Sequence, residues 1–196
     1  MKILITGICG FVGSSVAHAL LDRDSSLSIV GLDNLIRPGS EVNRPPLKAR
    51  GVKLIHGDIR SPSDFETIPA VDWVIDAAAN PSVMAGVDGR TSSRQLIEHN
   101  LTGTINMLEY CKRVRAGFIL LSTSRVYSIP PLSALPVEVV DRAYRPRLDG
   151  LSLAGLSLEG LSEDFSTAPP ASLYGTTKFA SENLALEYAD AFDFPV

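Results

Sequence analysis

Five short apolar runs along the chain alternate with segments in which apolar residues recur at helical spacing. The runs span residues 2–6, 28–33, 52–58, 73–79 and 117–123, and the main helical segments span 11–21, 96–112 and 175–191. Near-continuous Ile, Leu and Val, without polar alternation, is typical of strands that helices cover on both faces. The pattern therefore predicts an α/β fold with a doubly wound parallel sheet.

The segment from residue 128 to 172 interrupts this alternation. It contains six prolines and a stretch rich in Gly, Leu and Ser around residues 150–161. A segment of this length without helical or strand periodicity is usually either functional or disordered. Because it lies between two candidate catalytic motifs, we interpret it as an insertion that covers the substrate, within one domain of residues 1–196.

Charge and cysteine content exclude several classes of function. The chain has 18 Lys and Arg against 22 Asp and Glu, a net charge of −4, and no basic run longer than a pair, so we expect no nucleic-acid or membrane partner. No stretch reaches the roughly 18 apolar residues of a membrane helix, and the start lacks signal-peptide features, which predicts a cytoplasmic protein. Cys9 and Cys111 lack metal-ligand spacing, so we expect buried thiols and no metal site.

Three glycines follow the first run at a spacing that predicts a phosphate-binding turn. Residues 7–13, Gly-Ile-Cys-Gly-Phe-Val-Gly, leave the first strand and open the first helix. Gly7 permits a tight turn, Gly10 lets the backbone approach a pyrophosphate, and Gly13 allows the helix to pack closely on the strand. Backbone N–H groups at the helix start, where Phe11 and Val12 lie, then face the anion. We therefore expect this turn to bind a dinucleotide.

Polar side chains end the second and third runs, at the edge where such a sheet binds its ligand. Asp33 and Asn34 lie about 20 residues beyond Gly13, where a carboxylate accepts hydrogen bonds from the adenosine ribose and repels a 2′-phosphate. This predicts NAD rather than NADP, and we assign Arg37 to a solvated loop. Asp58 is placed either to contact adenine or to cap a helix.

A tyrosine and a lysine four residues apart open the last helical segment. Tyr174 and Lys178 would share one face of a helix, where the cation stabilises the phenolate and allows Tyr174 to act as a general base. The fifth run leads into hydroxyl side chains at a strand's carboxyl end, which point into the ligand crevice of such folds. Thr123 or Ser124 could hold a substrate hydroxyl against the tyrosine.

Together these motifs resemble those of the extended short-chain dehydrogenase/reductase superfamily, in its NAD-dependent sugar-nucleotide epimerase/dehydratase branch. The resemblance covers nearly the whole chain, and the matching motifs are Thr6-Gly7-x-x-Gly10-x-x-Gly13, Asp33-Asn34-Leu35, Gly57-Asp58-Ile59-Arg60, Ala78-Ala79, Asn100-x-x-Gly103-Thr104, Ser122-Thr123-x-x-Val126-Tyr127 and Tyr174-x-x-x-Lys178. It implies a Rossmann-type NAD-binding domain whose carboxyl-terminal substrate part is missing from these 196 residues. It also implies cofactor contacts from Asp58, Ile59, Ala78, Ala79, Asn100, Tyr174 and Lys178.

The resemblance also implies a mechanism in which Thr123, Tyr174 and Lys178 are catalytic, with Ser124 the less favoured hydroxyl. Tyr174 would remove a proton from a sugar hydroxyl while NAD takes the hydride, and return of the hydride to the opposite face would invert the carbon. Lys178 would hold the nicotinamide ribose, and Thr123 would share the hydrogen bond. Asn100 would hold the local backbone and a water near the lysine, although taken alone it could equally face solvent.

The function this implies is epimerisation of a nucleotide-diphosphate sugar, with the CDP-paratose/CDP-tyvelose 2-epimerase group as the most similar. Ser124 and Arg125 stand where dehydratases carry acidic residues, which disfavours dehydration. Two alternatives are a dehydrogenase or reductase of the same fold that releases its reduced cofactor, and a dinucleotide-binding module without catalysis.

Two positions depart from the family pattern, and one further property follows from it. Asp76 replaces a frequent histidine and Ser128 replaces a glycine, and we expect neither to touch the chemistry. The resemblance implies a homodimer in which the helices at 96–112 and 175–191 of both subunits form a four-helix interface.

Overall fold

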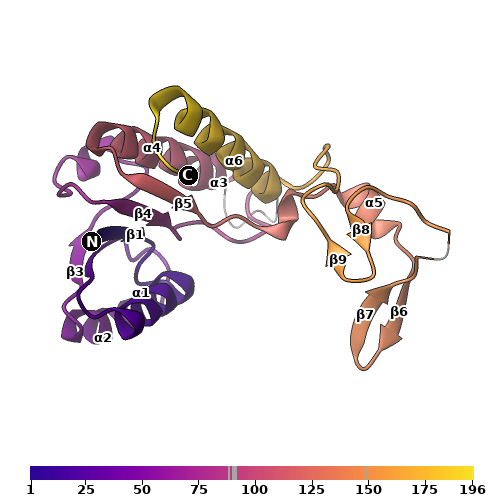
Figure 1. The fold of residues 1–196 in the computed structure, drawn as a ribbon, viewed down its shortest axis with the longest axis horizontal. Coiled ribbons are helices and arrows are strands. Elements are labelled where there is room, and N and C mark those ends of the chain that lie inside the picture. The colour runs from indigo at the N-terminus through magenta and orange to yellow at the C-terminus, as the bar shows by residue number, and fades with distance from the viewer. Residues whose placement is uncertain (88, 90–91, 149) are drawn as a thin grey trace.

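The computed structural model describes residues 1–196 except 88, 90–91 and 149. Five parallel strands form one sheet in the order β3-β2-β1-β4-β5 (Figure 1). Their bounds are β1 Lys2–Thr6, β2 Ser28–Asp33, β3 Lys53–His56, β4 Trp73–Asp76 and β5 Gly117–Leu120. The chain runs outward from β1 to β3 and then crosses back to β4, so the strand order reverses between β1 and β4. This confirms the predicted doubly wound sheet, whose ligand crevice lies at that reversal.

Helices cover the two faces of the sheet unequally (Figure 1). On one face lie α1 (Phe11–Arg23) and α2 (Arg44–Ala49), and on the other lie α3 (Ser93–Ile97), α4 (Gly103–Val114) and α6 (Leu173–Phe192). Alternate residues of β1 serve the two cores, because Ile3 and Ile5 belong to the cluster under α1 while Leu4 belongs to the cluster under α4. Within the described ranges, no helix is both long and apolar enough to cross a membrane.

Three of the predicted strands end earlier than expected. The sheet part of β3, β4 and β5 stops at His56, Asp76 and Leu120, and the residues that follow leave the sheet at its carboxyl edge. The predicted helix at 96–112 begins at Ser93, after a Ser92–Gln95 capping box, and is interrupted by a π-helical segment, η3 (Glu98–Thr102). Short 3-10 turns complete the connections and are η1 Ser40–Asn43, η2 Pro62–Phe65 and η4 Ser124–Val126.

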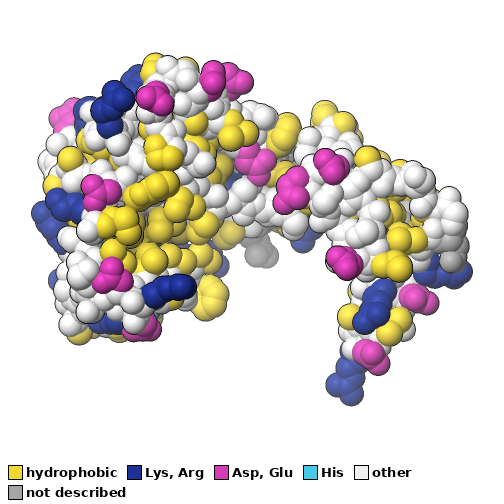
Figure 2. Space-filling model, viewed as in Figure 1, with side chains coloured by type: hydrophobic (Ala, Val, Ile, Leu, Met, Phe, Trp, Pro, Cys, Tyr) yellow, Lys and Arg dark blue, Asp and Glu magenta, His cyan; other side chains and the backbone are white. Residues whose placement is uncertain are grey.

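The insertion at 128–172 forms an arm that extends away from the sheet (Figures 1 and 2). It contains short elements that its prolines and glycines did not predict, namely α5 Ile129–Ser133, an antiparallel hairpin of β6 Val137–Val140 and β7 Ala143–Pro146, and a smaller one of β8 Leu156–Ser157 and β9 Gly160–Leu161. Its two ends are fastened together, because the Ser128 N–H donates to the Ser166 carbonyl at 2.8 Å and the Ile129 N–H to the Pro170 carbonyl at 2.9 Å. Residue 149 lies outside the described part.

The edge strand β5 is partly open on one side. The Phe118 N–H donates to the carbonyl of Pro195 at 2.8 Å, so the last residues of the chain return alongside β5. On the side of β5 that faces away from α4 and α6, Ile119 is 42% exposed, and Figure 2 shows hydrophobic side chains gathered on the body of the molecule between the two helical layers. The strand β5 is therefore covered mainly from the α4–α6 side.

Candidate functional site

The turn after β1 is shaped for glycine at its first and third positions. Gly7 has a φ of +61°, and a Cβ there would lie 2.9 Å from the Ala77 carbonyl oxygen of the chain leaving β4. A Cβ at Gly13 would overlap the Gly7 carbonyl oxygen. At Gly10 a Cβ would be 3.1 Å from that same oxygen, which is tight but not prohibitive. The turn can therefore bring α1 against β1 only because Gly7 and Gly13 lack side chains.

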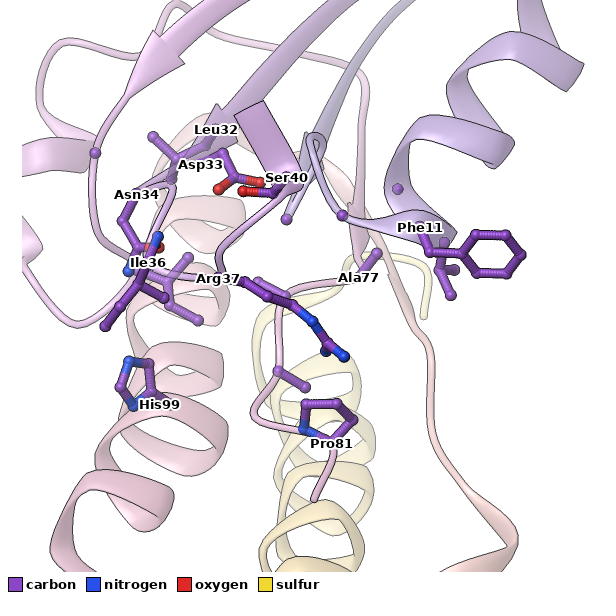
Figure 3. Close-up of a pocket in the computed structure, with 18 residues that line it drawn as sticks. Phe11, Leu32, Asp33, Asn34, Ile36, Arg37, Ser40, Ala77, Pro81 and His99 are labelled. Carbon is purple, nitrogen blue, oxygen red and sulfur yellow. The ribbon is translucent and has the colours of Figure 1, made fainter. Parts of the chain in front are cut away.

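The amino end of α1 offers backbone hydrogen-bond donors to a ligand. Its N-cap, Gly10, supplies no side-chain cap, and Phe11 is 84% exposed with its ring turned away from the pocket (Figure 3). First-turn N–H groups lack partners within their helix, so they favour an anion at this end. The glycine turn and this open helix end fit a dinucleotide pyrophosphate.

A cavity of about 380 Å³ lies in front of the turn, at the reversal of strand order. The residues predicted to bind cofactor that line it are Gly7, Gly10, Phe11, Val12, Gly13, Asp33, Asn34, Ile59, Ala78 and Ala79. Four others do not line it, namely Asp58, Asn100, Tyr174 and Lys178. The cavity therefore brings together the residues that follow β1, β2, β3 and β4.

Asp33 is held rigidly at the end of β2. Its Oδ2 accepts a hydrogen bond from the Cys9 N–H at 2.8 Å, and its Oδ1 accepts one from the Leu35 N–H at 2.8 Å. The carboxylate is thereby tied to the glycine turn itself, and its remaining lone pairs face the cavity beside Ser40 (Figure 3). The Ser40 hydroxyl is buried and, in the part of the chain that is described, has no hydrogen-bond partner. A vicinal diol such as a ribose would satisfy both groups.

Three further polar residues line this cavity. Arg37 is exposed on its loop, as predicted, and it also extends across the mouth of the cavity (Figure 3). Ser40 and His99 were not singled out. The Nδ1 atom of His99 lies 2.7 Å from the Gln95 carbonyl oxygen, while its Nε2 atom is buried and, among the described residues, without a partner. The position of His99 directly before Asn100 was the only sequence signal available.

Asp58 forms a tight local network rather than a helix cap. Arg60 donates to it twice, from Nε to Oδ1 at 2.9 Å and from Nη2 to Oδ2 at 2.6 Å, and the Asn34 amide donates at 3.1 Å. These bonds, with Arg60 first, hold the pKa of Asp58 well below its usual range despite partial burial. Asp58 therefore stays ionised and fastens the β3 loop to the β2 loop.

The start of α6 is packed against the loop that follows β5. Ser172 caps the helix by accepting the Gly175 N–H at 2.9 Å, and a Cβ at Gly175 would overlap the carbonyl oxygen of Arg125 in η4. Thr123, the N-cap of η4, is half-buried, and its Oγ1 accepts the Arg125 N–H at 3.2 Å. Gly175 matters for the site because it lets the first turn of α6 approach the loop that carries Thr123. Sequence reasoning did not single it out.

Tyr174 and Lys178 lie on the buried face of α6. They are 8% and 2% exposed, respectively. No described residue accepts a hydrogen bond from the Lys178 ammonium. Burial lowers the pKa of Lys178, while the nearby carboxylates of Asp76 and Glu182 act in the opposite direction. The pair is thus enclosed in protein with the lysine donors unused.

Asn100 is buried in η3 and braces the loop after β4. Its Oδ1 accepts the Asn80 N–H at 2.8 Å, and its Nδ2 donates to the Asn80 carbonyl at 3.1 Å and to Thr177 Oγ1 at 3.3 Å. The solvent-facing alternative for Asn100 is therefore wrong. Its contact with Thr177, directly before Lys178, connects the cavity loop to α6.

Asp76 links the end of β4 to the end of β1. It ends β4, is 2% exposed, and its Oδ1 accepts the Thr6 hydroxyl at 2.7 Å and the Ala78 N–H at 3.2 Å. Burial raises the pKa of Asp76, while the charge of Lys178 and these hydrogen bonds act in the opposite direction. That Asp76 lies apart from the chemistry stays a prediction. Ser128 stays apart, since its hydroxyl contacts Ser166 and Ala168 at the base of the arm.

These features define a class of protein, a Rossmann-type dinucleotide-binding domain with a Tyr–Lys pair beside the ligand crevice. The chain belongs to the NAD dependent epimerase/dehydratase family, whose model matches residues 3–196. Cys9 and Cys111 are buried, as expected, and burial raises their pKa values to about 11 and about 12. The described residues include no group of three or more His, Cys, Asp or Glu that could hold a metal ion.

Relatives of the chain include epimerases of nucleotide sugars. The chain is 28% identical to CDP-paratose 2-epimerase of Salmonella typhi over 98% of its length, and 30% identical to UDP-glucuronate 4-epimerase 3 of Arabidopsis thaliana over 95%. It is also similar to the crystal structure of a mutant UDP-glucuronic acid 4-epimerase from Bacillus cereus in complex with UDP-4-deoxy-4-fluoro-glucuronic acid and NAD, with a TM-score of 0.74 and 28% identity over the whole chain. The chain spans 54%, 38% and 54% of these three proteins, respectively.

Proposed function

We propose that this chain is the cofactor-binding part of an NAD-dependent epimerase that acts on a nucleotide-diphosphate sugar. The observation that carries the proposal is the placement of Tyr174 and Lys178, buried together on α6 next to the loop of Thr123. A sensor that only binds a dinucleotide has no need of a buried phenol and ammonium in this position. The relatives named above, which are epimerases of nucleotide sugars, support the same reading.

The residues of this chain would divide the chemistry as follows. Tyr174 takes the proton from a sugar hydroxyl as that carbon is oxidised, and later returns it. The Thr123 hydroxyl holds the same sugar oxygen, and the Lys178 ammonium donates to the phenolate and to a ribose hydroxyl. When bound, NAD supplies the reversible hydride acceptor. Return of the hydride to the other face inverts the carbon, and no cofactor is consumed.

We propose NAD rather than NADP because Asp33 is fixed at the ribose end of the cavity. Its two backbone hydrogen bonds prevent the carboxylate from turning away from a 2′-phosphate, so the repulsion would be felt in full. Arg37 at the mouth is exposed and on a loop, and its attraction would be screened by solvent. NADP should therefore bind more weakly than NAD.

The experiment that tests the proposal combines nucleotide release with one substitution. The purified chain is denatured and the released nucleotide identified by chromatography and mass, and turnover is then measured with CDP-paratose and UDP-glucuronate. We expect NAD, and we expect Tyr174→Phe to lower turnover by at least about 100-fold while NAD binding persists. Tyr144→Phe, which removes the same hydroxyl from the exposed hairpin, is the matched control.

Each contrary result has a distinct meaning. Unchanged turnover in Tyr174→Phe would eliminate the tyrosine as base. Reduced cofactor that accumulates in step with substrate would favour the dehydrogenase or reductase alternative. Binding of NAD without any turnover by the intact protein would favour the non-catalytic module.

We also propose a homodimer through the outer faces of α4 and α6. Exposed apolar side chains on α6, including Leu186 and Phe192, support it, and Tyr188 ties the two helices together by donating to Glu109 at 2.8 Å. Leu108 is buried in the core and is not available to the interface. A monomeric sedimentation profile at micromolar concentration would contradict the proposal. The cytoplasmic location stays a prediction from the sequence.

The arm at 128–172 is proposed to contribute to substrate binding. Its base supports this role, because one end follows directly on the loop of Thr123 and the other leads into the Ser172 cap before Tyr174. Any shift of the arm would therefore act on both proposed catalytic segments.

A further inference from the structure

The cavity in front of the glycine turn has two distinct ends. The amino end of α1, with Phe11, lies on one side of it and His99 lies on the other, with Asp33 and Ser40 between them (Figure 3). In a dinucleotide the adenosine ribose connects the pyrophosphate to the adenine base. If the glycine turn binds the pyrophosphate and Asp33 the ribose, the base falls at the end of the cavity that contains His99.

The His99 ring is held in one tautomer at that end. Its Nδ1 atom lies 2.7 Å from the Gln95 carbonyl oxygen, which can only accept a hydrogen bond, so Nδ1 carries the proton. In the neutral ring Nε2 is then a hydrogen-bond acceptor. This atom is buried and, among the described residues, has no hydrogen-bond partner. A buried acceptor of this kind favours a ligand that donates to it.

A ligand can reach this acceptor from the cavity. The ring projects from η3 toward Ile36 and Asn34 (Figure 3). Ile36 is 62% exposed on the loop after β2, so its side chain can turn aside to admit a flat group beside the ring. The buried side chain of Ile59 lines the same cavity. Apolar side chains together with a buried acceptor suit a planar heterocycle that carries a donor group.

Asp58, the carboxylate next to Ile59 in the sequence, has its acceptor positions filled from within the protein. Its Oδ1 accepts the backbone N–H and the Nε of Arg60, both at 2.9 Å. Its Oδ2 accepts Arg60 Nη2 at 2.6 Å and the Asn34 amide at 3.1 Å. A carboxylate has about four lone-pair positions, so a further donor would have to displace one of these bonds. His99 offers an acceptor without such an exchange.

We propose that His99 determines the preference of this chain for an adenine dinucleotide, by accepting a hydrogen bond from the exocyclic amine of the base at Nε2. The inference rests on the proposed binding of NAD in this cavity. The amine is the hydrogen-bond donor that the adenine base presents. Hypoxanthine carries a carbonyl oxygen in its place, which would face the Nε2 lone pair. The Gln95 carbonyl opposes a move of the ring proton to Nε2 that would relieve this contact.

The test compares NAD with nicotinamide hypoxanthine dinucleotide, in which an oxygen replaces that amine. The protein is freed of nucleotide and titrated with each dinucleotide by isothermal titration calorimetry at about pH 8, where a histidine side chain is normally neutral. We expect NAD to bind at least about 10-fold more tightly, because the analogue leaves a buried acceptor unpaired. His99→Leu should weaken NAD binding and reduce the preference to less than about 3-fold.

Three further variants separate this role from a general loss of structure. His99→Gln keeps an acceptor on the side chain and should retain a preference for NAD. His18→Leu removes an imidazole from α1 that does not line the cavity, and it should leave both affinities unchanged. Asp58→Asn tests the rival carboxylate, and the preference for NAD should persist in it.

A His99→Leu protein that keeps the full preference for NAD would overturn the inference, and so would loss of the preference in Asp58→Asn alone. If His99→Leu does not fold, the imidazole nitrogens of the three histidines are followed by NMR in the unaltered protein, and His99→Gln assigns the signal. An Nε2 resonance of His99 that shifts with NAD but not with nicotinamide mononucleotide, which lacks the base, supports the inference. A resonance that does not respond to NAD, or a protonated Nε2 in the NAD complex, overturns it.

The titrations require no substrate, which separates this inference from the proposed epimerase activity. A Tyr174-dependent epimerase that binds both dinucleotides equally would refute the role of His99 alone. A preference for NAD that depends on His99, in a protein without turnover, would refute the epimerase proposal alone. A protein that binds neither dinucleotide would refute both the binding of NAD and this inference.

Discussion

Replacement of Gly13 by alanine should destabilise the fold far more than the same replacement at Gly10, three residues earlier in the turn. The new methyl at position 13 would overlap the Gly7 carbonyl oxygen and lie 2.8 Å from the Gly7 carbonyl carbon and 2.9 Å from Ile8 Cα. All three are backbone atoms, so no rotamer change can relieve the contact. Inserting a methyl into a filled site costs about 1–3 kcal/mol. For a chain of 196 residues, in which 1 kcal/mol lowers Tm by about 2–4 °C, that corresponds to a fall in Tm of about 2–12 °C.

Gly10→Ala isolates the second use of glycine in the turn. Its methyl would meet only one atom, at 3.1 Å, so Tm should fall by less than about 2 °C. The methyl would nevertheless stand at the mouth of the helix end that is proposed to bind pyrophosphate, so NAD affinity should fall in a variant that remains folded.

Differential scanning calorimetry and a titration with NAD, monitored by tryptophan fluorescence, measure the two effects separately. Equal Tm losses in Gly13→Ala and Gly10→Ala would refute the steric account of Gly13. Unchanged NAD affinity in Gly10→Ala would refute the assignment of this turn to the pyrophosphate.

Two further predictions concern the loop network and the arm. Arg60→Gln should lower the stability measured by urea unfolding at pH 7, because the ion pair holds the Asp58 pKa below its usual value. That stabilisation is present above the ordinary carboxyl pKa near 4 and is lost as pH falls through the folded value. The difference in stability from the unaltered protein should therefore shrink below about pH 4, and a difference that grows there would contradict the prediction. Deletion of the hairpin 137–146, with Pro136 joined to Arg147 through Gly-Gly, should change Tm by no more than about 2 °C and leave NAD binding unchanged. The reason is that the Arg147 N–H already lies 2.8 Å from the Pro136 carbonyl oxygen and that the strands are mostly exposed. A larger fall in Tm would show that the hairpin packs on the body.

Sequence patterns predicted the parts of the fold that depend on local repetition. The apolar run Lys2–Thr6 forms a strand in which Ile3 and Ile5 face one core and Leu4 faces the other. The spacing of the glycines reflects the close contact of Gly7 and Gly13. The positions of Arg37 and Ser40 depend instead on the path of the loop after β2, in which Leu35 takes a φ of +57° that its residue type does not predict.

The interior of the site was less predictable because its contacts join distant parts of the chain. The buried hydrogen bond from Thr6 to Asp76, for example, joins residues 70 positions apart, and nothing near either residue in the sequence indicates it. The π-helical segment at Asn100 has no composition of its own, so a simple helical period was expected there. Gly175 could be recognised only once Arg125 was placed opposite it.

The contact between Asn100 and α6 bears on the order in which the protein matures during synthesis. Hydrogen bonds join Asn100 to Thr177 and Ser181, 77 and 81 residues further along the chain. The five strands and the glycine turn have all left the ribosome before α6 is made, and at about 5–20 residues per second that helix follows several seconds later. The sheet and its phosphate-binding turn can therefore assemble first. The residues proposed for proton transfer fall into place only when α6 docks, so ligand affinity precedes catalytic competence in the life of each molecule.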